Sequence, residues 1–125
     1  MKLCDYDRQI LQHIIRYADE IDETISKFGK DESLFREKHW YRNAVSMAIL
    51  QIGELANALT NDLRDARKEI PWRAVIGMRN RFAHSYGNMN LHTVWLTAIE
   101  SVPDLREKCQ KILDDCIEQE GIIHV

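Results

Sequence analysis

The chain has 125 residues, 45% hydrophobic and 30% charged, with a formal net charge of −3. These values are typical of one soluble globular domain, which we place at residues 1–125, and they exclude a disordered chain and a protein that coats nucleic acid over its whole surface. No stretch approaches the about 20 apolar residues of a membrane span, and the first residues lack the apolar core of a signal peptide, so we expect a cytoplasmic protein that does not contact membranes.

The first segment has the apolar spacing of an amphipathic helix from Asp7 onward. Gly29 follows the last apolar residue, in the position that a helix C-cap prefers. Residues 31–33 contain Asp and Ser, which favour the N-cap of a following helix. The apolar residues step by three or four positions and form one stripe: Ile10, Ile14, Tyr17, Ile21, Ile25 and Phe28.

A second helix is predicted over residues 34–63 as one continuous element. Residues 44–59 within it are apolar on more than one face, which indicates the central, most enclosed helix of the fold. Glu54 lies inside this apolar run. A carboxylate in such a place needs a partner, so Glu54 either pairs with an arginine from another helix or has a role near a functional site.

Two further helices complete the predicted fold. Residues 70–72, Ile-Pro-Trp, open a third helix because proline suits its first turn, and Gly87-Asn88 ends it. Asn90 is a candidate N-cap for the fourth helix, and Pro103 interrupts that helix without changing the phase of its apolar stripe, which predicts a kink. The stripe steps by four and three: Leu91, Trp95, Ala98, Val102, Leu105, Cys109, Ile112 and Cys116. Short links between such helices predict an all-α, up-and-down bundle of about four main helices.

The cysteines and histidines do not have the spacing of a metal site. Three cysteines are present without a C-x-x-C pair, and the five histidines form neither H-x-x-x-H nor H-x-x-E-H. Cys109 and Cys116 share a helical stripe, so we expect buried or half-buried thiols. We therefore expect no metal and no other cofactor.

Charge is distributed unevenly along the chain. Residues 62–81 carry six cations against three acids, whereas residues 100–120 carry seven acids against three cations. This polarity is compatible with one anion-attracting patch on an acidic body. It is equally compatible with solvated helix faces.

The cluster R-N-x-x-x-H-x-Y, formed by Arg79, Asn80, His84 and Tyr86, is the strongest functional signal. Each residue has a structural interpretation. Arg79 is either a surface cation or a partner for Glu54, and Asn80 can form a hydrogen bond with a neighbouring backbone group. His84 is a favourable residue at a helix C-terminus, and Tyr86 is an aromatic residue of an interface.

The combination has the groups that cleave a phosphodiester without a metal. The imidazole of His84, with an ordinary pKa near ~6.5, can exchange protons with the attacking 2′-hydroxyl or the leaving oxygen. The guanidinium of Arg79 can stabilise the charge of the transition state, and Asn80 can orient the imidazole or bind substrate.

Helical geometry separates the two main groups. At ~100° per residue, Arg79 and His84 lie about 140° apart around an ideal helix. They can therefore act together only if the helix ends before His84, or if the Arg of one chain meets the His of another across a two-fold axis. The second route predicts an obligate dimer.

These residues lie in segments that closely resemble the HepT-like branch of the HEPN superfamily. The segments are "QIGELANAL" (51–59), "IPWRAVIGMRNRFAHSYGNMNLHTVW" (70–95) and "VPDL" (102–105). The resemblance covers most of the chain and is weakest in the first helix and the final dozen residues.

The resemblance implies a homodimeric helical bundle that acts as a metal-independent endoribonuclease toxin. It implies that Arg79 and His84 are catalytic, with Asn80 supporting them, in a cleft formed by both subunits. It also implies a neighbouring antitoxin, a nucleotidyltransferase of the MNT type, that transfers AMP to Tyr86. Arg81 replaces what is often an apolar residue in relatives, and we interpret it as added affinity for RNA. An AMP group two positions from the base would repel and exclude an RNA phosphate.

Two other interpretations stay open. The complete motif favours catalysis, but the net acidity leaves open a non-catalytic helical subunit that docks a nucleotidyltransferase or binds a nucleotide. The third is a structural helical dimer without a ligand.

Overall fold

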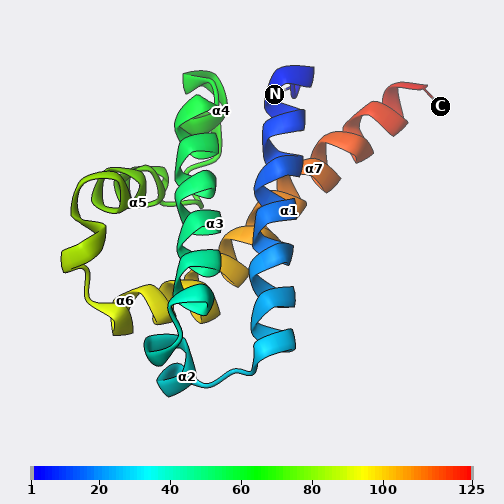
Figure 1. Cartoon of the computed structure of the whole chain (residues 1–125). Helices are drawn as coiled ribbons and strands as arrows, with labels where there is room; N and C mark the ends of the chain where they lie inside the picture. Colours follow the sequence, from blue (N-terminus) through cyan, green and yellow to red (C-terminus); the bar gives the residue numbers. More distant parts are fainter. Residues whose placement is uncertain (1, 125) are drawn as a thin grey trace.

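The computed structural model describes residues 2–124, with the side chains of residues 83–86 and 117–124 left out of the description. Within this part every regular element is helical, which confirms the all-α prediction (Figure 1). The elements in chain order are α1 (Asp5–Phe28), α2 (Glu32–Glu37), α3 (His39–Ala58), α4 (Asn61–Ala66), α5 (Trp72–Ser85), η1 (Tyr86–Asn88), α6 (Leu91–Leu96), η2 (Thr97–Ser101) and α7 (Val102–His124).

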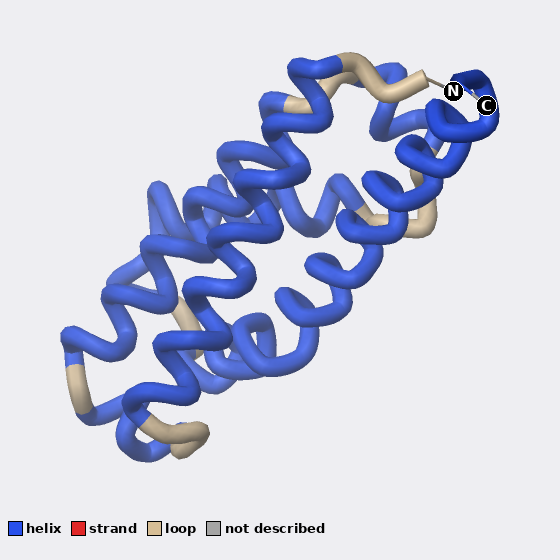
Figure 2. Tube along the Cα trace, turned by 90° about the vertical axis from the view of Figure 1, so that its right-hand side faces the viewer, coloured by secondary structure: helices blue, strands red, loops and turns tan. Residues whose placement is uncertain are grey.

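The long helices α1 and α3 run side by side in opposite directions and form the centre of the fold. α7 also packs on α1, and α5 packs on α3 (Figure 1). Figure 2 shows that only short loops join the helices. Among the described residues, no helix combines the length and the apolar character that a bilayer span requires.

The sequence prediction for α1 is confirmed. Most of its apolar stripe is buried against α3 and α7. Gly29 ends the helix with φ 108°, a left-handed conformation that favours glycine, and its N–H donates to the carbonyl of Ile25. Asp31 then caps α2 by accepting hydrogen bonds from the N–H groups of Ser33 and Leu34, as the N-cap prediction required.

The prediction of one helix over residues 34–63 is wrong. The chain forms α2, α3 and α4 instead, because Lys38 and Leu59 adopt extended conformations. Neither position carries the glycine or proline that usually signals such a break. The helical periodicity continued across both breaks, so periodicity alone did not locate them.

A buried carboxylate explains the second break. Asp7 is only 3% exposed, and its oxygens accept hydrogen bonds from the backbone N–H and the hydroxyl of Thr60, at 3.0 and 2.6 Å. The Thr60 hydroxyl also accepts from the N–H of Leu63 and so caps α4. The α3–α4 junction is therefore fixed to the first turn of α1.

The predicted fourth helix is continuous but irregular. Asn90 caps α6 as expected, and η2 is a π-helical turn that leads into α7 without leaving the right-handed helical region. Pro103 lacks the N–H that would bond the carbonyl of Ile99, and its ring would collide with that carbonyl in an α-helix. The wider π turn precedes this position, and Figure 1 shows the path turning between α6 and α7.

The two cysteines on the apolar stripe are buried, as predicted. Cys109 and Cys116 are free thiols in the core, whereas Cys4 is exposed. Burial raises the pKa of Cys109 to about 12. This thiol is therefore a packing group rather than a nucleophile.

Candidate active site

The start of α5 is fixed by an indole and a guanidinium. The Trp72 ring is buried, and its Nε1 donates to the carbonyl of Arg67 at 2.9 Å. The Arg67 guanidinium in turn bonds Asp115 of α7 at 3.1 Å and Glu69 at 2.8 Å. These contacts set the position of α5 relative to α7, and with it the position of every motif residue downstream.

Arg79 of α5 is paired with Glu54 of α3. The Arg79 Nε lies 2.5 Å from a carboxylate oxygen of Glu54, and its Nη1 donates to the side-chain oxygen of Asn80 at 3.2 Å. The two charged side chains are 37% and 45% exposed, so the pair lies at the surface. Of the two roles considered for Glu54, the structure shows the pairing with an arginine from another helix. The predicted site residues Glu54, Arg79 and Asn80 therefore lie together.

The close approach of α3 and α5 depends on Gly53. A Cβ added to Gly53 would lie 2.9 Å from the Cβ of Arg79 and 3.1 Å from its backbone nitrogen. Carbon atoms in ordinary contact are about 3.5–4.0 Å apart, so only glycine allows the two helices to meet here. The sequence analysis missed this role, and its only signal was a glycine inside an otherwise helical pattern.

The guanidinium of Arg79 is held without using all of its donors. Its Nε is engaged by Glu54 and one N–H of Nη1 by Asn80, and no described residue accepts from Nη2. Arginine has five N–H donors in a planar fork. The arrangement therefore fixes the direction of the fork and leaves donors for an anionic ligand, while Glu54 offsets the positive charge.

The helix α5 continues through His84 to Ser85, and Tyr86 begins η1. The first of the two geometric routes, a helix that ends before His84, is therefore wrong. Within one chain the positions of Arg79 and His84 stay about 140° apart around α5. The side chains of His84 and Tyr86 lie outside the described residues.

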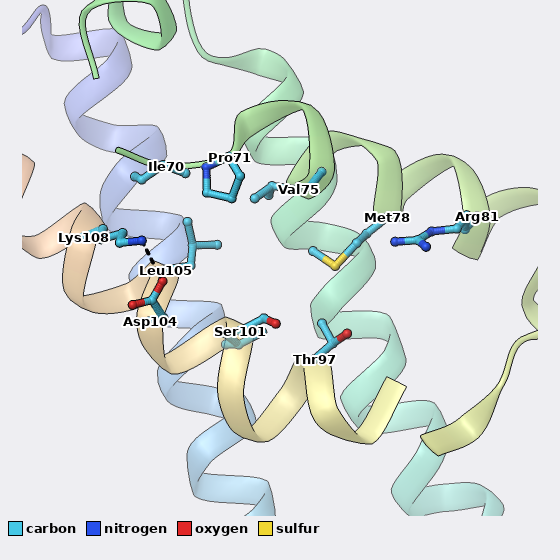
Figure 3. A pocket seen from close by; sticks show the side chains of 12 residues that line it. Ile70, Pro71, Val75, Met78, Arg81, Thr97, Ser101, Asp104, Leu105 and Lys108 are labelled. Atoms are coloured by element: carbon cyan, nitrogen blue, oxygen red, sulfur yellow. Dashed lines mark ion pairs between the residues drawn. The ribbon is translucent and has the colours of Figure 1, made fainter. Parts of the chain in front are cut away.

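Arg81 does not join Arg79. It lies about 160° from Arg79 around α5 and lines a groove of about 260 Å³ between α5 and the η2–α7 segment, as Figure 3 shows. The role in RNA affinity given to Arg81 stays a prediction. The structure places Arg81 on the opposite side of α5 from Arg79.

A second groove, of about 330 Å³, lies between α3 and α5 beside the Arg79–Glu54 pair. Met47 on its wall is 57% exposed, and the Oγ of Ser46 is buried without a hydrogen-bond partner among the described residues. The sequence analysis missed this surface, because residues 44–59 are apolar on several faces and do not reveal which face stays open. The groove is lined by Asn43, Ser46, Met47, Leu50 and Phe82.

The described side chains include no group of three or more His, Cys, Asp or Glu residues that could hold a metal ion. The prediction that the chemistry needs neither a metal nor a cofactor stays a prediction.

Residues 14–112 match the family described as ribonuclease HepT-like. The chain belongs to the HepT-like ribonuclease family. The match spans the whole of α3 and α5, including the pair formed by Glu54 and Arg79. The resemblance noted in the sequence is thereby confirmed.

Several individual proteins align with most of this chain. A protein of Thermococcus cleftensis, provisionally named ribonuclease HepT, is 29% identical over 84% of this chain and 94% of its own length. Proteins provisionally named RNases from Caldanaerobacter subterraneus and Methanocaldococcus jannaschii are 27% and 28% identical, over 85% and 90% of this chain and 93% and 95% of their own lengths. No solved structure matches the chain significantly.

Proposed function

We propose that this HepT-like protein is a metal-independent endoribonuclease whose site combines Arg79 of one subunit with His84 of a second. The observation that carries the proposal is the fixed Arg79 fork. Glu54 and Asn80 orient it, Gly53 lets α5 approach closely enough for the pair to form, and donors remain for a phosphate. The polarised charge of the sequence places this fork in its most basic segment.

The helical geometry favours a homodimer. Because α5 includes His84, the positions of Arg79 and His84 diverge by about 140° within one chain. A two-fold axis near the end of α5 can bring the His84 of a second subunit to the Arg79 fork. Each dimer would then hold two equivalent pairs.

The groove between α3 and α5 offers a surface for the second subunit. Leu50 lies one helical turn from Glu54, and Phe82 lies almost one turn from Arg79, so the groove adjoins the charged pair. Met47 exposes more than half of its apolar side chain there. A second copy packed on this groove would bury that apolar surface.

The proposed reaction is an attack of a ribose 2′-hydroxyl on the adjacent phosphorus. The imidazole of one His84 accepts the proton of the 2′-hydroxyl, the 2′-oxygen bonds to phosphorus, and the bond to the 5′-oxygen breaks. The 5′-oxygen then takes a proton from the same imidazole, which is now protonated, or from water, giving a cyclic phosphate and a free 5′-hydroxyl. The Arg79 fork donates to the phosphate oxygens, whose negative charge increases in the transition state.

We further propose that the protein is a cytoplasmic toxin neutralised by an MNT-type nucleotidyltransferase. Tyr86 lies two positions after His84, and addition of AMP there would place a phosphate charge and a purine beside the cleft. Both would exclude an RNA phosphate from the site.

The test compares wild type with His84→Ala, expressed without a partner protein and also purified. Growth arrest by wild type alone, with RNA cleavage that persists in excess chelator, is the expected result. If neither protein inhibits growth and purified wild type leaves RNA intact, the nuclease proposal is refuted. Co-expression with a nucleotidyltransferase followed by mass spectrometry tests Tyr86, and modification without any cleavage by the unmodified protein would instead support a non-catalytic binding subunit.

A further inference from the structure

The groove between α5 and the η2–α7 segment has the composition of a subsite for a planar polar ring. Its floor is apolar, with Val75, Val102 and Leu105 almost fully buried. Thr97 and Ser101, four residues apart on the π turn, place hydroxyl groups on one wall (Figure 3). π turns occur often at functional sites because they re-aim the side chains of a helix.

The two ends of the groove differ in charge. At one end the Lys108 ammonium and the Asp104 carboxylate form an ion pair of 2.9 Å, which leaves that end neutral. At the other end lies Arg81, whose guanidinium forms no hydrogen bond or ion pair with any described residue. Figure 3 shows this guanidinium directed back along α5 toward Met78. As far as the described side chains show, the positive charge at the Arg81 end of the groove has no acidic partner.

The size of the groove limits what can fill it. A volume of about 260 Å³ is far more than the ~30 Å³ share of one water molecule and lies just below the ~300–1,000 Å³ of pockets for drug-sized ligands. It is too large for a lone ion and too small for a helix of a partner protein. One nucleobase with its attached sugar is a ligand of suitable size.

We propose that this groove binds one nucleotide of the RNA strand next to the phosphate that is cut. The base lies on the apolar floor with its polar edge toward Thr97 and Ser101, and the phosphate of the same nucleotide meets the Arg81 fork. The reverse orientation would place a phosphate against the Asp104 carboxylate. This inference rests on the proposed ribonuclease function and adds to it a base-binding subsite.

The position of Arg81 on α5 connects this subsite to the cleavage site. Arg81 and His84 are three residues apart in one helix, so their positions lie on neighbouring faces, about 60° apart and within one turn. An RNA strand that passes His84 therefore meets Arg81 within one turn of the helix. Guanidinium planes commonly stack on, or bond to, unpaired RNA nucleotides.

Two variants separate the subsite from general attraction of RNA. Ala74 is exposed on α5 and lines the groove, so Ala74→Leu fills the groove while keeping a strong helix former. Arg81→Gln removes the charge at the groove end. Arg73→Gln is the matched control, because Arg73 is an exposed arginine of the same helix that does not line the groove.

The experiment measures binding of a short single-stranded RNA whose 2′-hydroxyls are methylated to prevent cleavage, together with variants that lack the base at one position each. For wild type we expect one abasic position to weaken binding about tenfold, the effect of one well-packed base. The same abasic position should have no effect on binding to Ala74→Leu, because the groove is already filled. Arg81→Gln should weaken binding more than Arg73→Gln does.

The outcomes distinguish the two proposals. If wild type cuts RNA but every abasic position affects wild type and Ala74→Leu alike, the subsite is wrong and the ribonuclease proposal stands. Equal losses in Arg81→Gln and Arg73→Gln would likewise overturn the phosphate contact. If wild type neither binds nor cuts any RNA, the proposed function fails and the subsite fails with it.

Discussion

Replacing Gly53 with alanine tests whether the close approach of α3 and α5 holds Arg79 in place. The added Cβ would lie 2.9 Å from the Cβ of Arg79 and 3.2 Å from its Cα. Neither atom is the free end of a side chain, so the helices themselves have to move apart by roughly half an ångström to reach an ordinary carbon–carbon contact. Such overpacking costs about 1–3 kcal/mol of unfolding free energy.

The matched control is Gly77→Ala on α5, where an added Cβ meets no atom within 4 Å. Both substitutions gain about 0.5–1 kcal/mol because alanine is a better helix former than glycine. This gain cancels in the difference between the two variants. Gly53→Ala should therefore be less stable than Gly77→Ala by about 1–3 kcal/mol, a difference of at least about 3 °C in Tm.

Gly53→Ala should also lower the rate of RNA cleavage at temperatures where the protein stays folded. Moving α5 away from α3 displaces the Arg79 fork, and misplacement of a catalytic group by less than 1 Å can lower the rate about tenfold or more. We would measure Tm by circular dichroism and RNA cleavage at a temperature where both variants are folded. Equal Tm values and equal cleavage rates for the two alanine variants would refute the role assigned to Gly53.

Three further predictions concern other groups. Glu54→Ala should reduce the rate of RNA cleavage about tenfold and Glu54→Gln should reduce it less, because only glutamine keeps an acceptor for Arg79. Each variant should change the unfolding free energy by under about 1 kcal/mol because the pair is half exposed. Equal cleavage rates of the two variants would contradict this prediction. Met47→Arg should convert the proposed dimer to monomer and abolish cleavage, as measured by sedimentation, and a monomeric wild type would contradict it. A thiol reagent should label Cys4 in the native protein and Cys109 only after unfolding, because burial raises the pKa of Cys109 to about 12; labelling of both cysteines at one rate would show the core to be open.

Local signals in the sequence predicted much of the fold. The stripe of α1, the Gly29 C-cap and the N-caps Asp31 and Asn90 all depend on residues within a few positions of each other. The break between α3 and α4 was missed because it depends on a contact between distant residues. Thr60 is held by Asp7, which is 53 residues away in the sequence, and no pattern around Thr60 reveals that contact.

The candidate site was predictable only in part for the same reason. The motif itself, and the choice of Glu54 as a partner for Arg79, could be read from residue types. The role of Gly53 required knowing which residue of α5 crosses α3 at that point. The separation of Arg81 from Arg79 could have been predicted from the sequence, because residues two positions apart lie on nearly opposite faces of a helix. Their shared positive charge suggested a single patch instead.

The helix α5 thus divides its polar residues among three directions, and this division constrains how RNA can lie on the protein. Arg79 is turned toward α3 and its carboxylate, and Arg81 toward the groove with the π turn. The position of His84 lies about 60° from Arg81 and about 140° from Arg79 around the helix. One strand contacting a single chain can therefore meet Arg81 and His84 together but not Arg79 and His84. If Arg79, Arg81 and His84 all contact one RNA strand, Arg79 has to come from a second subunit, so the proposed subsite at Arg81 and the proposed dimeric site require the same arrangement of two α5 helices.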